Sequence, residues 1–177
     1  CIGSLVEASI NRPSLAIQTN SLLPHFLNEI SEKYNFKLIH ISTDCVFDGS
    51  KGRYKESDKK TETNYYGLTK LNAEKIVLSK DKNVILRTSV VYGNHVKSRF
   101  TNWIINNLNQ KIKVDPHNDQ YNTPTLVNDL VQSIIKIISN DVCGLFHATG
   151  KTCLSRYEFA KEISLQFGFD QNLIIPV

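Results

Sequence analysis

The chain has 177 residues, of which 41% are hydrophobic and 21% charged, and its formal net charge is +4. This composition is ordinary for a folded globular domain and argues against a disordered, fibrous or low-complexity protein. No apolar run approaches the roughly 20 residues of a membrane helix, and the first residues lack the basic and apolar segments of a signal peptide. Basic residues in 51–62 alternate with acidic ones, which is typical of a solvated loop. We therefore expect a cytoplasmic protein without a membrane or nucleic-acid partner.

The chain contains no methionine, so we expect it to begin after the start of its gene product. Its 4 cysteines are widely spaced and form no Cys-x-x-Cys pair, and its 5 histidines are scattered. Reduced cysteines in a cytosolic protein explain this spacing better than a zinc site does. We therefore expect no metal centre.

Apolar, β-branched runs alternate with longer helical patterns along the chain. The patterns predict, in chain order, a helix over 13–34 broken near Pro24, a strand over 37–42, a turn over 48–52, a helix over 66–80, a strand over 83–88, a helix over 100–108, a short strand over 111–114, a helix from an N-cap at Thr125 to Ile138, a strand over 144–149, and a helix opened by a capping box at Ser155 and ended by Gly168. This alternation predicts an α/β fold with a mostly parallel sheet and helices on both of its faces.

Ligands of such sheets bind beyond the carboxyl ends of the strands, which directs attention to the residues that follow Ile41. Two hydroxyls and a carboxylate stand there, on Ser42, Thr43 and Asp44. These side chains either cap the following turn or take part in chemistry. From spacing alone, capping is the slightly better explanation.

Tyr66 and Lys70 are four residues apart in a predicted helix and therefore share one face. An ammonium beside a phenol favours the phenolate, so we expect a lowered Tyr66 pKa and a side chain that can donate and accept a proton. Chance alone gives roughly 0.6 Tyr-x-x-x-Lys pairs in such a chain, and Tyr157 with Lys161 is a second one. We interpret Tyr157 as a packing residue, because only the Tyr66 pair follows a strand end that carries a threonine and an aspartate.

Several blocks resemble the extended short-chain dehydrogenase/reductases, and within them the dTDP-4-dehydrorhamnose reductase branch. The blocks are Ser-Thr-Asp-Cys-Val-Phe-Asp-Gly over 42–49, Tyr-Gly-Leu-Thr-Lys-Leu-Asn-Ala-Glu over 66–74, Leu-Arg-Thr-Ser-Val-Val-Tyr-Gly over 86–93 and Asp-Gln-Tyr-Asn-Thr-Pro-Thr over 119–125. Their order and spacing are far more specific than either tyrosine–lysine pair.

The resemblance implies a Rossmann-like, doubly wound, mostly parallel sheet with a small C-terminal substrate-binding part. Residues 1–177 would form one incomplete NAD(P)-binding domain, with substrate-binding elements mainly in 94–125 and 144–177. The sequence has no Gly-x-Gly-x-x-Gly loop to hold phosphates. The resemblance would place that loop, with the first βαβ unit, before Cys1. We therefore expect the 177-residue piece alone to be inactive.

The resemblance implies an oxidoreductase that reduces the 4-keto group of a nucleotide-linked deoxysugar with NADH or NADPH, as in dTDP-rhamnose and polysaccharide biosynthesis. Tyr66 would give a proton to the developing alkoxide, Lys70 would hold the nicotinamide ribose, and Thr43 would bind the carbonyl oxygen. Asp44 would lie beside the substrate. The resemblance also leaves a homodimer open as an assembly.

Other implied sites are Cys1, Ile2 and Gly3, which would line the cofactor cleft, and Val90, which stands on the substrate side where the family often has tryptophan. Asn20 matches a helix asparagine whose role is structural or functional. Two alternative functions remain open. One is a sugar-nucleotide epimerase or dehydratase of the same superfamily, and the other is a non-catalytic subunit that resembles the beta subunit of methionine adenosyltransferase.

Overall fold

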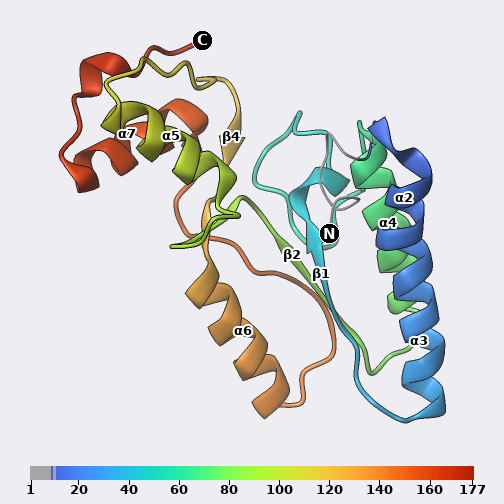
Figure 1. Ribbon diagram of the computed structural model, residues 1–177. Coiled ribbons are helices and arrows are strands. Elements are labelled where there is room, and N and C mark those ends of the chain that lie inside the picture. Colours follow the sequence, from blue (N-terminus) through green and yellow to red (C-terminus); the bar gives the residue numbers. More distant parts are fainter. Residues whose placement is uncertain (1–8, 10) are drawn as a thin grey trace. The chain divides into compact units, whose positions relative to one another are not determined.

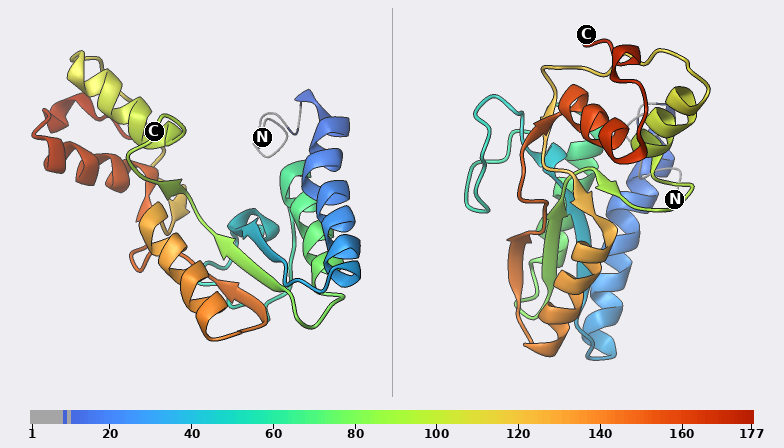
Figure 2. Two further views of the ribbon diagram at one scale, coloured as in Figure 1. Left: turned by 60° about the horizontal axis from the view of Figure 1, so that its bottom comes forward. Right: turned by 90° about the vertical axis from the view of Figure 1, so that its left-hand side faces the viewer.

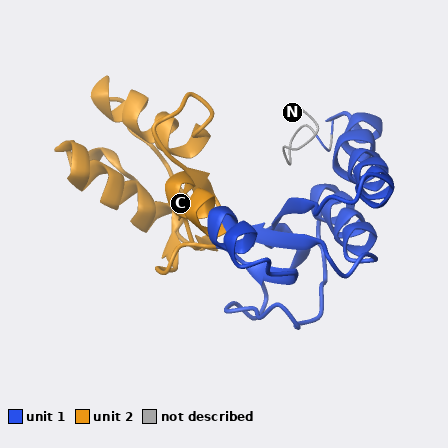
Figure 3. Cartoon of the chain, turned by 90° about the horizontal axis from the view of Figure 1, so that it is seen from below, with its two compact units in different colours: residues 1–88, 134–148 blue, residues 89–133, 149–177 orange. Residues whose placement is uncertain are grey.

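The computed structural model describes residue 9 and residues 11–177, which divide into two compact units. Unit 1 comprises the residues up to Thr88 together with Ile134–Ala148. Unit 2 comprises Ser89–Ser133 and Thr149–Val177, and Figure 3 shows the two units in different colours. The predicted site residues Cys1, Ile2 and Gly3 lie outside the described residues.

Unit 1 is built on a parallel sheet whose order is β1-β2-β6. Its strands are β1 (Ile39–Thr43), β2 (Val84–Thr88) and β6 (Gly144–His147). Every residue of β2 is buried, as expected of a central strand covered on both faces. The predicted strands at 37–42, 83–88 and 144–149 are therefore confirmed to within a few residues.

The helices of unit 1 lie on both faces of this sheet. On one face are α2 (Pro13–Ile17), a π-helical segment (Gln18–Leu22), α3 (Leu23–Lys33) and α4 (Tyr65–Val77). Residues 134–139, the part of α6 (Val127–Ser139) that belongs to this unit, lie on the other face (Figures 1 and 2). The expected α/β arrangement is confirmed. The break expected near Pro24 is the π-helical segment, which widens the helix just before the proline while the backbone stays helical through Leu22 and Leu23.

Polar side chains join α3 and its preceding turn to α4. The Asn20 side chain donates to Thr69 Oγ1 at 3.1 Å, and Asn28 Nδ2 donates to the carbonyl of Ile76 at 3.0 Å. Asn28 also accepts a hydrogen bond of 2.7 Å from the Asn83 side chain. Because these groups are buried, an unpaired partner would be costly, so the bonds fix the position of α4 along the sheet.

Unit 2 has its own apolar core between two helices. Its elements are β3 (Val91–Tyr92), α5 (Arg99–Asn109), β4 (Tyr121–Asn122), β5 (Thr125–Leu126), the start of α6 (Val127–Ser139), β7 (Leu154–Ser155), α7 (Arg156–Phe167) and a short 3₁₀ turn (Gln171–Leu173). Ile104 and Leu108 of α5 pack with Phe159 and Ile163 of α7. The predicted capping box at Ser155 and the left-handed helix end at Gly168 are both confirmed.

Two sequence predictions in this unit are wrong. No strand forms over 111–114, where Val114 makes only an isolated bridge with Ile174. Thr125 does not cap α6, because it lies in β5 and the helix begins at Val127. Its hydroxyl donates instead to the carbonyl of Ser89 at 2.7 Å and so holds the segment that follows β2.

Within residues 9 and 11–177, no helix has the length and apolarity to cross a bilayer. The same residues contain no group of three or more His, Cys, Asp or Glu side chains placed to hold a metal ion. Among the residues that the structure describes, Cys45, Cys143 and Cys153 take part in no disulfide bond.

Candidate active site

The carboxyl end of β1 carries the first part of the site. Thr43 is the last residue of the strand and the N-cap of a 3₁₀ turn over Asp44–Val46. Its Oγ1 accepts a hydrogen bond of 3.2 Å from the Cys45 amide and lies 3.1 Å from Asp44 Oδ1. The capping role suggested by the sequence is therefore present. It does not exclude a chemical role, because the Thr43 side chain also lies close enough to Tyr66 to affect the pKa of the phenol.

The first turn of α4 brings Tyr66 to that strand end. Asn64 is the N-cap of α4 and accepts a hydrogen bond of 2.7 Å from the Gly67 amide, so the helix begins just before Tyr66. Thr43 acts to lower the pKa of Tyr66, so the start of α4 brings the two predicted hydroxyls near each other. A ketone oxygen that bound here would meet the Tyr66 hydroxyl, whereas the Thr43 hydroxyl donates to Asp44 Oδ1 and would have to turn away from it to act as a second donor.

The ionisation of Tyr66 differs from our expectation of a lowered pKa. Burial, with smaller contributions from nearby Cys45 and Asp44, raises the pKa of Tyr66 to about 12, and the nearby Thr43 side chain opposes this only in part. The prediction failed because it considered one neighbouring charge and omitted the loss of solvent around the phenol. Tyr66 is therefore a neutral phenol near pH 7, which suits a proton donor rather than a base.

Lys70 is held by β1 rather than by the tyrosine. Its Nζ donates to the carbonyl oxygen of Ile41 at 2.6 Å and lies 3.0 Å from His40 Nε2. Burial lowers the pKa of Lys70 to about 8, and Glu74 opposes this shift. Burial and the charge of Lys70 together lower the pKa of His40 to about 3, so its imidazole is neutral near pH 7. A neutral imidazole can accept a hydrogen bond from the Lys70 ammonium.

The neutral His40 predicts a loss of stability in mild acid. The unfolded chain protonates this imidazole below about pH 6.5, whereas the folded chain does so only near pH 3, so stability falls as the pH drops through this window. The expected slope is about 1.4 kcal/mol per pH unit. Urea unfolding between pH 7 and pH 5 should show a steeper loss for the wild type than for His40→Gln. The same substitution at the exposed His25 is the control and should leave the pH dependence of stability as in the wild type. A His40→Gln variant that loses stability with falling pH as steeply as the wild type would contradict the prediction.

Gly67 allows α4 to lie directly against the turn after β1. A Cβ at this position would stand 2.2 Å from the carbonyl oxygen of Cys45, which belongs to the backbone and cannot move aside cheaply. We expect Gly67→Ala to shift the start of α4 and to destabilise the fold by about 1–3 kcal/mol, as overpacking does. Thermal unfolding measures this effect. Leu68→Ala, at the exposed neighbouring position, should cost less, and equal costs would contradict the steric explanation.

The predicted residues divide between the two units. Thr43, Asp44, Tyr66 and Lys70 all belong to unit 1 and gather around the carboxyl end of β1. Val90 belongs to unit 2, where it packs against the apolar core and has a φ of 40°. Its assignment to the substrate stays a prediction.

The second tyrosine–lysine pair packs as expected. Lys161 Nζ lies 5.1 Å from the centroid of the Tyr157 ring, over which it makes a cation–π contact. Tyr157 itself packs against the core of unit 2, and its neighbour Phe159 belongs to that core. The interpretation of Tyr157 as a packing residue is confirmed.

Sequence reasoning missed a buried ion pair behind the site. Arg87 of β2 and Glu74 of α4 are joined at 2.6 Å with side-chain exposures of 1% and 3%. Two signals were available. Glu74 stands four residues beyond Lys70 and so shares its helix face, and Arg87 interrupts an otherwise apolar strand.

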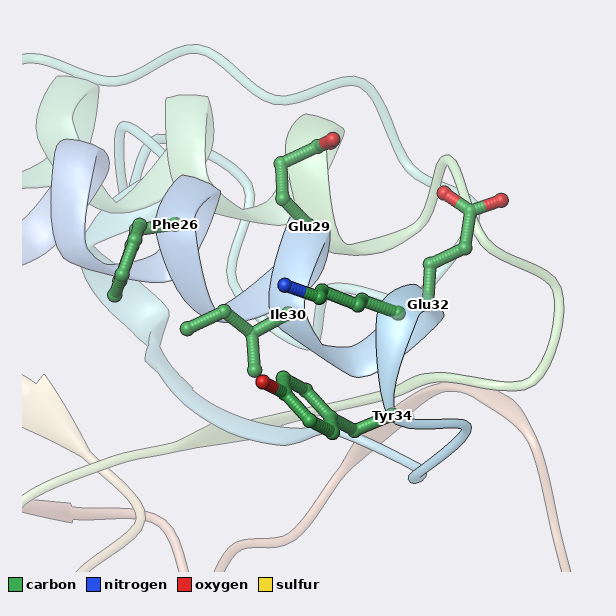
Figure 4. Close-up of a pocket in the computed structure, with 6 residues that line it drawn as sticks. Phe26, Glu29, Ile30, Glu32 and Tyr34 are labelled. Carbon is green, nitrogen blue, oxygen red and sulfur yellow. The ribbon is translucent and has the colours of Figure 1, made fainter.

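An open hollow lies elsewhere on unit 1, along α3 (Figure 4). Figure 4 shows Phe26, Ile30 and Tyr34 along the helix and its C-terminal end, with charged neighbours beside them. No residue of the candidate active site lines this hollow, so the two features are separate.

The family model described as "RmlD substrate binding domain" matches residues 6–177. The chain belongs to this family. It is 32% identical over 167 residues to a dTDP-4-keto-6-deoxy-D-glucose reductase of Streptomyces niveus, which covers 93% of this chain and 58% of that protein. It is also 32% identical over 155 residues to a dTDP-4-dehydrorhamnose reductase of Aggregatibacter actinomycetemcomitans, with coverages of 83% and 52%.

Among solved structures, the fold matches a dTDP-4-dehydrorhamnose reductase of Bacillus anthracis in complex with NADP. The TM-score is 0.92 at 30% identity, over 98% of this chain and 62% of that one. The chain thus spans between 52% and 62% of the length of these relatives. The Rossmann-like α/β fold expected from the sequence is confirmed by this match.

Proposed function

We propose that the full-length product of this gene reduces the 4-keto group of a nucleotide-linked deoxysugar, with NADH or NADPH as the reductant. The observation that carries the proposal is that Tyr66, in the first turn of α4, and Thr43, at the carboxyl end of β1, lie close enough for Thr43 to affect the pKa of the phenol, with Lys70 one helical turn away and hydrogen-bonded to β1. Membership of the RmlD substrate binding domain family and the two reductases described above support the substrate class.

The polar groups of unit 1 fit the reacting end of a reduced nicotinamide cofactor. A reduced nicotinamide supplies, when bound, the hydride that a protein side chain cannot. Lys70 is the residue that would hold the nicotinamide ribose, and Cys1, Ile2 and Gly3 would line the cleft. Lys70 is suited to this role because its ammonium is already fixed by the carbonyl of Ile41 and by His40.

Tyr66 acts as the general acid. Its raised pKa keeps the phenol protonated near pH 7, and the proton moves readily to an alkoxide, which is a stronger base than a phenolate. Thr43, turned away from Asp44, donates a second hydrogen bond to the same oxygen and orients the ketone. Two such donors stabilise the charge that develops on that oxygen in the transition state.

The sugar nucleotide is proposed to bind mainly through residues 94–125 and 144–177. Asp44 lies next to Thr43 and is proposed to contact the sugar, and the assignment of Val90 to the sugar stays a prediction from the sequence. Valine where the family often has tryptophan removes an indole from the sugar pocket. We therefore propose that the substrate is a 4-keto deoxysugar nucleotide, not restricted to that of rhamnose biosynthesis. The reaction would belong to cytoplasmic polysaccharide or nucleotide-sugar biosynthesis.

A second candidate function is that of a non-catalytic subunit. The chain is 26% identical over 178 residues to "Methionine adenosyltransferase 2 subunit beta" of Xenopus laevis. The presence of Thr43, Tyr66 and Lys70 together favours the enzyme. A purely binding role needs neither a buried phenol nor a threonine hydroxyl close to it. A homodimer of either protein stays a prediction.

The experiment is an assay of the full-length gene product with dTDP-4-keto-6-deoxyglucose and either NADH or NADPH. A reductase consumes one cofactor for each sugar reduced, which the loss of absorbance at the nicotinamide band reports. An epimerase or dehydratase would convert a sugar nucleotide while recycling its cofactor without net loss. Cofactor binding without any conversion of a sugar nucleotide would favour the non-catalytic subunit and contradict the proposal.

A further inference from the structure

One face of α4 contacts β1 at three successive turns. Tyr66, Lys70 and Glu74 are spaced four residues apart and therefore line up on this face. Tyr66 lies close enough to Thr43 for that side chain to affect its pKa, and Lys70 donates to the carbonyl of Ile41. Glu74 makes the third contact, and it is the one that neither the proposed mechanism nor the sequence analysis uses.

The carboxylate of Glu74 is fully engaged in the interior. Its Oε1 accepts hydrogen bonds from Ser42 Oγ at 2.5 Å and from Arg87 Nε at 2.9 Å, and its Oε2 accepts one from Arg87 Nη2 at 2.6 Å. All three residues are at least 97% buried. The two parallel bonds from the guanidinium fix the carboxylate in angle as well as in distance.

The partners of Glu74 stand one residue before the ends of two neighbouring strands. Ser42 and Arg87 are register partners in β1 and β2, and Thr43 and Thr88 are the next pair. One carboxylate of α4 therefore contacts both strands at the position immediately before Thr43 and Thr88. A change in this contact would alter the distance between the Thr43 and Tyr66 hydroxyls.

Arg87 extends the same contact to the loop that follows Asp44. Its guanidinium carbon lies 5.1 Å from the centroid of the Phe47 ring, and its Nη1 lies 3.4 Å from the carbonyl of Glu56. The Phe47 ring in turn stacks on Tyr54 with a centroid distance of 4.3 Å. The ion pair thus holds the loop as well as the helix.

We propose that Glu74 is a positioning residue of the reductase, which sets the placement of Tyr66 against Thr43 by binding Ser42 and Arg87 together. This inference rests on the proposed function. It differs from a purely structural role in one respect. Loosening the Ser42 contact should slow the chemical step more than an equal loss of stability elsewhere on α4.

The test compares Ser42→Ala with Asn28→Ala in the full-length gene product. Ser42→Ala removes one hydrogen bond to Glu74 and leaves its ion pair with Arg87 intact, so the variant should fold. Asn28→Ala is the matched control, because Asn28 anchors the other end of α4 through the carbonyl of Ile76. We expect kcat to fall about tenfold in Ser42→Ala with little change in the KM for the cofactor, and Ser42→Thr to restore it. Asn28→Ala should lower the melting temperature but leave kcat unchanged.

A second readout does not depend on activity. With 3-fluorotyrosine in place of tyrosine, the ¹⁹F signal of Tyr66 is assigned by its loss in Tyr66→Phe. This signal should shift in Ser42→Ala and stay in place in Asn28→Ala. An unmoved signal, or equal losses of kcat in the two variants, overturns the positioning role. A wild-type protein without reductase activity overturns the proposed function instead, and the fluorine signal still decides whether Glu74 positions Tyr66.

Discussion

Tyr66→Phe should reduce the turnover of a 4-keto nucleotide sugar by about 10²–10⁴-fold while cofactor binding survives. The substitution removes the one proton that the proposed mechanism transfers and keeps the aromatic ring that fills the space beside Thr43. Because the phenol is neutral near pH 7, its removal changes no charge in the folded protein at that pH. Steady-state kinetics with saturating cofactor, together with fluorescence titration of NADPH, separates the two effects.

Tyr65→Phe is the matched control, because it removes a hydroxyl from the neighbouring residue in the same first turn of α4. This variant should keep wild-type kcat. Turnover that persists in Tyr66→Phe would remove the tyrosine from the mechanism, even if the full-length protein is a reductase. A parallel loss of cofactor affinity would instead indicate that the hydroxyl holds the cofactor rather than donating a proton.

The sequence predicted the sheet well because its strands are short apolar runs, each bounded by polar turns. β2 is buried along its whole length, and its first three residues, Val84, Ile85 and Leu86, are the apolar, mostly β-branched run by which the sequence marks a central strand. The capping box of Ser155 and Glu158 could be predicted equally well, because both side chains bind backbone groups of the same first helical turn. The strand expected at 111–114 failed because pairing depends on a distant partner, and Val114 finds only a bridge with Ile174.

The site was predicted only in part, for a physical reason. Spacing placed Tyr66 and Lys70 on one helix face, and the family blocks brought Thr43 to the same place. Spacing carries no information about burial, and burial decides the ionisation of these side chains. The Tyr66 pKa therefore rises where one neighbouring charge suggested a fall, and Lys70 turns to the carbonyl of Ile41. The contact between Glu74 and Arg87 depends in the same way on how α4 lies across two strands.

Breaking the buried ion pair should give the largest loss of stability in this chain. Arg87→Met leaves the carboxylate of Glu74 buried in unit 1 without its guanidinium partner. Of the two residues that donate hydrogen bonds to this carboxylate, Ser42 remains. Removing one partner of a buried pair costs about 3–5 kcal/mol, because the remaining charge is desolvated without compensation. Urea unfolding of Arg87→Met and of Glu74→Gln, each against the wild type, measures this cost. A loss below about 1 kcal/mol, the range of exposed pairs, would contradict the burial of the pair.

The triple variant Ser42→Ala, Glu74→Leu, Arg87→Met separates stability from geometry. It removes the Glu74 carboxylate, the Arg87 guanidinium and the Ser42 hydroxyl together, so none of these three groups stays buried without the others. Apolar replacements of buried ion pairs are often neutral or stabilising, and we expect the triple variant to recover most of the stability that Arg87→Met loses. Its kcat should stay low, because apolar side chains have no directional contact with which to hold α4 in register with β1. Burying this pair confers little net stability, so recovered stability without recovered turnover would identify its role as the alignment of Tyr66 with Thr43.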